Sequence, residues 1–314
     1  MNTLKLLPKG ILIAVFLISI CSWGFFAHKH INHQAVFSLP AELMPFYKNN
    51  IHFLTEHAVD PDKRRYIIKT EACKHYLDLD HYPEIKQKSE LLSYYQAREF
   101  YSEDSLNKHG TLPWNILRQM KYLEDAFKDQ NEELILKYSA DIGHYIGDAH
   151  VPLHTTSNYN GQFTNQHGIH GLWESRIPEL YFQNYNLWIG RAQYLTSPKD
   201  SIWKCIFESN DLVEKVLSAE LNANHKVSES KKYSIHYKNG NPIKAYSPLF
   251  CKHYQSLLGN MVEARLRKSI QLTADCWYTC WINAGKPILH TTKVAKISKK
   301  EKVEGSSVSD ECIH

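Results

Sequence analysis

Two histidine–carboxylate pairs with the same spacing constrain this chain more than any other feature of its sequence. His144 and Asp148 stand four residues apart, and so do His170 and Glu174. Residues four apart lie on one face of a helix, with Cβ atoms about 5–6 Å apart, so each pair can hold one cation. Imidazole nitrogens and carboxylate oxygens suit zinc and related transition metals. His154 lies between the pairs, and this density of candidate ligands favours a site for more than one metal ion.

A single pair of this kind has a commoner interpretation. The chain contains 18 histidines, so some histidine–carboxylate pairs arise by chance and stabilise their helix by only about 0.2–0.5 kcal/mol. Two pairs with a histidine between them are much harder to explain in this way. Ile142, Tyr145 and Ile146 also predict a buried helix face around the first pair. A buried carboxylate needs a partner, and a metal ion is one of the few adequate ones.

Apolar residues recur at three- and four-residue spacing over most of the chain, which predicts an all-α protein. We find no convincing alternating series that would indicate strands. Asn131 can cap the helix that carries His144, and Pro152 ends that helix before His154. The polar loop 155–168 should swing the chain back, so that the second pair faces the first. The expected helices cover residues 40–57, 84–101, 114–127, 131–150, 178–194, 201–221 and 247–283.

The N-terminal residues 1–22 are typical of a secretory signal peptide. Lys5 and Lys9 precede a short apolar stretch, which is followed by Cys21 and Ser22. An uncleaved anchor helix is the alternative, although about 20 apolar residues are needed to span a bilayer. A lipid anchor on Cys21 is a weaker alternative. We therefore expect a secreted or periplasmic protein.

The rest of the chain is predicted to be one domain followed by a tail. Residues 23–290 suit a single domain in length and composition. Residues 291–314 change from Lys-rich to Gly- and Ser-rich sequence, which predicts a disordered tail. Seven cysteines, or six without the leader, permit disulfides in an exported chain but do not reveal their pairing.

Charge and motif content exclude several classes of protein. A formal net charge of +4 is too small to indicate nucleic-acid or anionic-membrane binding by itself. The chain has no CxxC pair with zinc-finger spacing, so any metal site depends on histidines and carboxylates. The HExxH motif of metalloproteases is absent, and so are the cysteine ligands of zinc deaminases.

Further candidate ligands lie upstream of the two pairs. Trp23 opens the chain after the expected cleavage site, and His28, Asp60 and His75 follow in that order. With the downstream residues, this series resembles the superfamily of zinc-dependent phospholipases C and single-strand-specific zinc nucleases. The resemblance covers residues 23–174, about half of the mature chain. The matching positions are Trp23, His28, Asp60, His75, His144, Asp148, His154, His170 and Glu174.

The resemblance implies a single multi-helix domain that holds three Zn²⁺ ions. His75, His144, Asp60 and Asp148 would bind the first zinc, and these two aspartates are the expected catalytic carboxylates. Asp62 is an alternative to Asp60, although the fifteen-residue step from Asp60 to His75 fits the nucleases better.

Asp148 would bridge to a second zinc, which His28 and the free α-amino and carbonyl groups of Trp23 would also bind. These two metals would share a hydroxide nucleophile. An amide nitrogen in the precursor is a poor ligand, so signal removal would complete this site. The third zinc would stabilise the leaving oxygen and would be held by His154, His170 and Glu174.

The resemblance divides over the substrate. Glu174 and the short step to His170 are similar to the phospholipases, whereas the short step from Trp23 to His28 is similar to the nucleases. We favour a phospholipase C-like phosphodiesterase, with a nuclease for single-stranded DNA or RNA as the alternative. The partner is then a phospholipid or a single-stranded nucleic acid, membrane contact stays open, and we expect a monomer. A non-catalytic metal- or ligand-binding protein is the alternative of another class.

Other polar residues have less specific interpretations. Asp78 and Asp141 could orient ligand imidazoles, but exposed helix carboxylates are the favoured interpretation. Arg64 and Arg65 could contact a phosphate, but a solvated pair is favoured.

Overall fold

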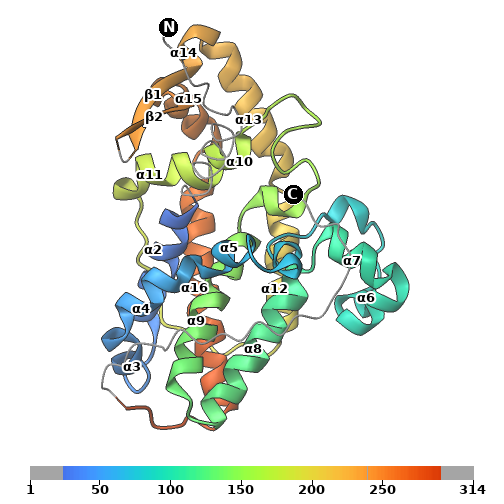
Figure 1. The fold of residues 1–314 in the computed structure, drawn as a ribbon, viewed down its shortest axis with the longest axis vertical. Coiled ribbons are helices and arrows are strands. Elements are labelled where there is room, and N and C mark those ends of the chain that lie inside the picture. The colour runs from blue at the N-terminus through green and yellow to red at the C-terminus, as the bar shows by residue number, and fades with distance from the viewer. Residues whose placement is uncertain (1–23, 239, 291–314) are drawn as a thin grey trace, which may run out of the picture.

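The computed structural model describes residues 24–238 and 240–290, which form a mostly helical molecule (Figure 1). The all-α prediction is therefore confirmed at the level of fold class. The predicted signal peptide 1–22, Trp23 and the predicted tail 291–314 lie outside the described residues.

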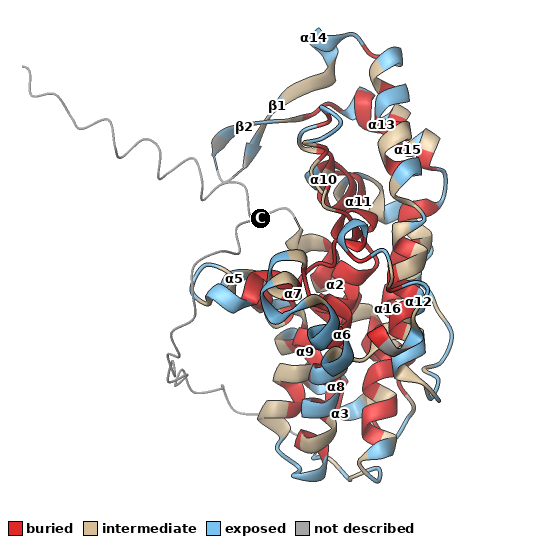
Figure 2. Cartoon of the chain, turned by 90° about the vertical axis from the view of Figure 1, so that its right-hand side faces the viewer, coloured by how far each residue is buried: buried red, intermediate tan, exposed pale blue. Residues whose placement is uncertain are grey.

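Four helices form the centre of the molecule. They are α2 (Phe25–Ala35), α8 (Leu112–Lys128), α9 (Glu132–Ala149) and α16 (Met261–Asn283). Helix α9 packs against the other three, and buried residues line the helices where they meet (Figure 2). The core is therefore built around the helix that carries the first histidine–carboxylate pair.

The remaining helices and helical turns pack around or beyond this centre, and some of them carry residues of the candidate site. The α-helices are α3 (Met44–Asn49), α4 (Ile51–Glu56), α5 (Asp60–Arg64), α6 (Tyr94–Tyr101), α7 (Glu103–His109), α10 (Ile169–Gly171), α11 (Ile177–Tyr181), α12 (Pro198–Asn210), α13 (Val213–Lys226), α14 (Glu229–Lys232) and α15 (Pro248–Leu258). The 3₁₀ turns are η1 (Val36–Ser38), η2 (His57–Val59), η3 (Lys69–Lys74), η4 (Leu79–His81), η5 (Ser89–Leu92), η6 (Pro152–Thr155) and η8 (Phe182–Asn184), and η7 (Leu172–Arg176) is a π-helical turn.

Local sequence explains why α9 forms where it does. The side chain of Asn131 accepts a hydrogen bond from the backbone N–H of Leu134 at 3.1 Å and so caps the helix. Two glutamates occupy the first turn, where the helix dipole favours negative charge. The helix ends at Ala149, and Pro152 begins the next 3₁₀ turn. The predicted helix 131–150 is confirmed.

Two glycines on α9 allow α2 to approach it closely. A Cβ atom at Gly147 would lie 2.7 Å from Nδ1 of His28, and a Cβ atom at Gly143 would collide with the side chain of Asn32. The amide of Asn32 donates to the backbone carbonyl of Ala140 at 3.1 Å, which fixes the crossing. This close contact brings His28 alongside the first histidine–carboxylate pair.

Five of the predicted helices are divided or shortened. The segments 40–57, 201–221 and 247–283 each contain two α-helices, and 84–101 and 178–194 are α-helical only over α6 and α11. The spacing of apolar residues predicts which residues face the core, but it does not indicate where one helix ends and the next begins.

The segment after α11 shows what replaces a predicted helix. The backbone N–H of Gln193 donates to Asp275 at 2.7 Å, and that of Leu195 donates to Thr279 at 2.9 Å. Side chains of α16 thus accept the hydrogen bonds that backbone carbonyls would have accepted within a helix.

A glycine ends α15. Gly259 has a φ of 65°, a conformation that glycine adopts at little cost.

One β-hairpin is present, so the expectation of no strands is wrong. Strand β1 (Tyr233–Lys238) pairs in antiparallel register with β2 (Asn241–Tyr246). The signal was in the sequence: Tyr233, Ile235 and Tyr237 alternate with polar residues, just before an Asn-Gly dipeptide that favours tight hairpins.

Two further observations concern the cysteines and the helices of the described residues. Cys205, Cys251, Cys276 and Cys280 are buried as free thiols, so none of these four forms a disulfide. Among residues 24–238 and 240–290, no helix combines the length and apolarity required to cross a membrane.

Candidate metal centre

The predicted metal ligands come together beside the C-terminal turns of α9. The π-helical turn and the loop before it bring the second pair back to the first, as the sequence predicts. Three groups of ligand atoms each lie within 4.8 Å of one another, so three candidate metal-binding groups are present. They are His28, His144 and Asp148; Asp62, His75 and His144; and His154, His170 and Glu174.

Asp148 lies at the point where these groups meet. Its Oδ2 atom is 2.9 Å from Nδ1 of His75 and 3.3 Å from Nε2 of His144. Its Oδ1 atom is 3.3 Å from Nε2 of His28 and 3.9 Å from Nε2 of His154. The side chain is only 2% exposed. One buried carboxylate therefore presents each of its oxygens to a different pair of imidazoles.

Glu174 connects the third group to the others. Its Oε2 atom is 2.7 Å from Nε2 of His170 and 3.5 Å from Nε2 of His154. Its Oε1 atom is 3.3 Å from Nε2 of His28. His170 and Glu174 lie where α10 passes into the π-helical turn η7, and such turns often occur at functional sites. The pair makes its contact as predicted, although not on a regular α-helix.

Asp62, and not Asp60, is the aspartate of α5 that joins the ligands. Oδ1 of Asp62 lies 3.8 Å from Nδ1 of His75 and 3.8 Å from Nε2 of His144. Asp60 instead pairs with Nδ1 of His57 at 2.5 Å and with Nζ of Lys63 at 2.8 Å. The single turn of α5 points its first residue away from α9 and its third residue toward it. The alternative ligand therefore replaces Asp60 in the first group.

Backbone carbonyls orient two of the imidazoles. Nδ1 of His144 donates to the carbonyl of Ala58 at 2.8 Å, and Nδ1 of His154 donates to the carbonyl of His75 at 2.6 Å. With Nδ1 donating to a carbonyl, the Nε2 atom of each ring faces the carboxylates. Metal-binding histidines are commonly held in this way.

The arrangement of donors fits a metal ion. Nδ1 of His75 and Nε2 of His144 lie 3.1 Å apart, so two imidazole nitrogens converge on the same space. Nε2 of His154 is buried and makes no hydrogen bond within the described residues. Converging imidazole nitrogens and buried carboxylates match the ligand preference of zinc and related ions.

The electrostatics keep the carboxylates in the form that binds metals. Burial raises the pKa of Asp148, but His144 and His154 outweigh it and hold that pKa well below its usual range. The neighbouring histidines lower the pKa of Glu174 in the same way against its burial. Burial lowers the pKa of His144, yet Asp148 and Asp62 raise it to about 9. Both carboxylates are therefore ionised at neutral pH.

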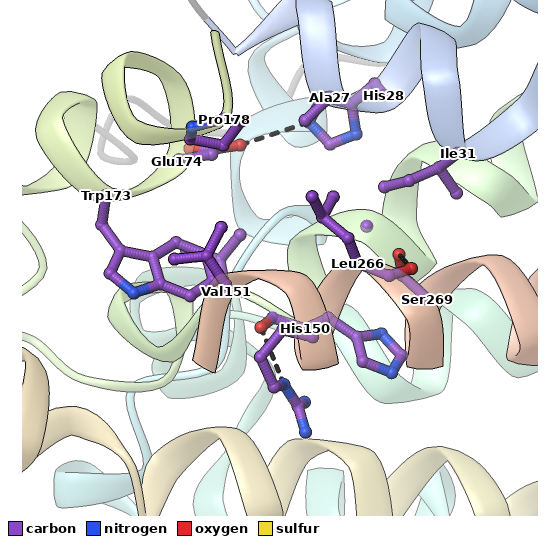
Figure 3. Close-up of a pocket in the computed structure, with 13 residues that line it drawn as sticks. Ala27, His28, Ile31, His150, Val151, Trp173, Glu174, Pro178, Leu266 and Ser269 are labelled. Atoms are coloured by element: carbon purple, nitrogen blue, oxygen red, sulfur yellow. Dashed lines mark hydrogen bonds and ion pairs between the residues drawn. The ribbon is translucent and has the colours of Figure 1, made fainter. Parts of the chain in front are cut away.

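The candidate ligands differ in their exposure to solvent. The side chains of His170 and Asp62 are 24% and 22% exposed, whereas those of His75 and His144 are at most 1% exposed. An apolar cavity of about 20 Å³ adjoins the cluster, with His28 and Glu174 at its edge (Figure 3). That volume accommodates about one water molecule. Asp62 and His170 are therefore the most exposed side chains of the three candidate groups.

The start of the described chain lies at the third group. A Cβ atom at Gly24 would be 3.3 Å from Oε1 of Glu174, so the backbone before α2 runs against that carboxylate. Trp23, the predicted terminal ligand, lies outside the described residues.

Two interpretations of polar residues are wrong. Asp141 is not an exposed helix carboxylate, because it is only 4% exposed and binds Arg64 through both of its oxygens. Arg64 is accordingly not a solvated side chain. Asp78 is buried as well, with Oδ2 at 3.5 Å from Nδ1 of His109, which is not a predicted ligand. A sequence does not reveal which side chains cover a carboxylate, so the burial of Asp78 and Asp141 was not predicted.

No protein-family model matches this chain, and no curated protein matches it. The resemblance to zinc-dependent phospholipases C and zinc nucleases therefore rests on the order and chemistry of the ligand residues.

Proposed function

We propose that this protein is a zinc-dependent hydrolase of phosphodiester bonds with a site for three Zn²⁺ ions. The observation that carries the proposal is the position of Asp148, whose two oxygens face separate imidazole pairs. A carboxylate in this position suits a bridge between two metals. The group of His154, His170 and Glu174 would hold a third ion.

Each group has a defined task in this proposal. Bound zinc would supply a hydroxide at neutral pH and Lewis acidity toward a phosphoryl oxygen. Asp148 would bridge and orient two ions, while Asp62 and His75 would complete the coordination of one of them. Arg65, whose Nη1 lies 3.8 Å from Oδ1 of Asp62, would meet an anionic phosphate.

Among phosphodiesters, we favour a phospholipid, cleaved in the manner of a phospholipase C. The support is the glutamate at the end of the second pair and the short step that precedes His170. Single-stranded nucleic acid is the alternative substrate, because the step from Trp23 to His28 is similar to the zinc nucleases. We further propose export through an N-terminal signal.

A side-by-side assay tests this function. The mature protein is incubated with a chromogenic phosphodiester, phosphatidylcholine, single-stranded DNA and RNA, before and after chelation. We expect chelation to abolish hydrolysis and zinc to restore it, with phosphatidylcholine the best natural substrate. Full activity after complete metal removal would contradict the zinc mechanism. Zinc binding without hydrolysis of any substrate would identify a non-catalytic metal-binding protein.

A second test concerns the N-terminus. We expect a chain that retains residues before Trp23 to bind less zinc and to hydrolyse the chromogenic substrate more slowly than the chain that starts at Trp23. The reason is that an amide nitrogen cannot replace a free amine as a ligand. Zinc content by atomic absorption and initial rates give the comparison. Equal values for both chains would remove Trp23 from the site.

A further inference from the structure

A second layer of polar residues lies directly behind the group formed by Asp62, His75 and His144. Its members come from the same three segments as those ligands. They are Arg64 on α5, Glu71 in η3, and Asp141 and Tyr145 on α9. We call this set the Arg64 network.

Direct hydrogen bonds connect every member of the Arg64 network. The guanidinium of Arg64 donates from Nη1 and Nη2 to the two oxygens of Asp141, at 3.2 and 3.0 Å. Nη2 also donates to Oε1 of Glu71 and to the hydroxyl oxygen of Tyr145, both at 3.3 Å. The hydroxyl of Tyr145 in turn donates to Oε1 of Glu71. Nζ of Lys74 donates to Oε2 of Glu71 at 2.6 Å.

The Arg64 network is buried and balanced in charge. Glu71 is 1% exposed, Asp141 is 4% exposed and Tyr145 is not exposed at all. The two carboxylates face the two cations Arg64 and Lys74. Buried ion pairs often add little net stability, because desolvation offsets their attraction. A bidentate guanidinium–carboxylate pair does, however, fix geometry closely.

Each member stands close in sequence to one ligand. Arg64 follows Asp62 by two residues on a helix of only five residues. Asp141 precedes His144 by one helical turn on α9. The bond between Arg64 and Asp141 therefore fastens the short helix α5 to α9 and holds Asp62 near His144.

Glu71 stands one turn before His75 and faces its ring. Oε1 of Glu71 is 4.0 Å from Nε2 of His75. That nitrogen is buried and has no hydrogen bond in the described part of the chain. The other ring nitrogen, Nδ1, points at Asp148 and His144. The carboxylate thus lies on the side of the imidazole opposite to the ligand cluster.

We propose that Arg64, Glu71, Asp141 and Tyr145 are positioning residues that fix the metal-binding geometry of Asp62, His75 and His144. The proposal rests on the metal binding in the proposed function and adds residues that do not touch the metal. It predicts an effect on one group of ligands and not on the group of His154, His170 and Glu174, which lies outside the network.

Zinc titration of the full chain after chelator treatment tests the proposal. The variants Tyr145→Phe, Glu71→Gln and Asp141→Asn each keep side-chain volume while removing a hydroxyl or a charge. We expect each to weaken one zinc site by about 10–100-fold, the range for groups that orient metal ligands. The site of His154, His170 and Glu174 should keep its affinity. Asp141→Glu retains a carboxylate for Arg64 and should restore part of the loss.

Asp275→Asn is the matched control, because Asp275 is also buried but binds Gln193 and Gln271, which do not belong to the Arg64 network. It should leave every zinc affinity unchanged. A purely structural role would lower the melting temperature of the chelated variants without changing zinc affinity, and that result overturns the proposal. If Glu71→Gln or Asp141→Asn folds poorly, Tyr145→Phe still tests the proposal, because it removes only one oxygen atom. If the wild-type chain binds no zinc, both the proposed function and this inference are wrong. If the wild type and the variants bind zinc with equal affinity, only the inference is wrong.

Discussion

Asp148 shows how much one side chain can organise. It is surrounded by four imidazoles, and each of its oxygens faces two of them. In the low-dielectric interior these partners hold its pKa down despite burial. An ionised carboxylate with two available oxygens is what a bridge between metal ions requires. The candidate site therefore depends on the environment of this residue as much as on its identity.

A matched pair of aspartates on α5 tests the ligand assignment at the residue scale. We expect Asp62→Asn to weaken zinc binding and slow hydrolysis by at least about 10–100-fold, because it removes a carboxylate from the first group. Asp60→Asn should leave zinc binding within about twofold, since Asp60 pairs with His57 and Lys63. Zinc titration and initial rates of both variants decide the matter. If Asp60→Asn weakened zinc binding more than Asp62→Asn, Asp60 would be the ligand.

At the scale of elements, the crossing of α2 over α9 determines where His28 lies. The two helices can touch because glycine stands at residues 143 and 147. Substitution of either glycine would separate the helices and move His28 away from Asp148. The crossing also carries the start of the described chain to Glu174. One helix contact thus brings the N-terminal segment to a site made mainly by residues 62–174.

Gly147→Ala should disturb this crossing. The added Cβ would lie 2.7 Å from Nδ1 of His28, and overpacking of this kind costs about 1–3 kcal/mol. We expect a lower melting temperature and weaker zinc binding. Gly171→Ala is the control, since its Cβ would meet nothing within 4 Å. Similar behaviour of the two variants would contradict the close approach.

For the whole molecule, buried charge makes stability depend on pH. Burial raises the pKa of Glu71, but Arg64 and Lys74 outweigh it and lower that pKa from 4.5 to about 2. A depressed carboxylate pKa means that the unfolded chain binds a proton more readily than the folded one. The contribution of Glu71 is therefore fully present above about pH 4.5 and is lost as the pH falls toward about 2.

The variant Glu71→Gln should flatten this dependence. Melting temperatures of the chelated wild type should fall between about pH 5 and pH 2, and those of Glu71→Gln should fall less over the same range. Thermal denaturation followed by circular dichroism at half-unit pH steps makes the comparison. Parallel curves for the two proteins would show that Glu71 is not the source of the loss.

The sequence by itself was sufficient to predict the helical class, the helix that carries His144 and Asp148, and the histidines of the three candidate groups. These features depend on local spacing, capping and residue chemistry, which a sequence displays directly. The hairpin was also visible in the alternation of Tyr233, Ile235 and Tyr237, although that alternation spans only a few residues.

The tertiary structure alone decided which aspartate of α5 meets His75, and that Arg64 and Asp141 are buried partners. Two aspartates separated by a single proline look equivalent in sequence. Only the direction in which one helical turn faces α9 distinguishes them. Burial is likewise a property of what packs over a residue, and for Asp141 the covering side chain comes from 77 positions earlier in the chain. Contacts over such distances leave no periodic signal, so most of the candidate ligands could be named from the sequence, but the aspartate of α5 that joins them could not.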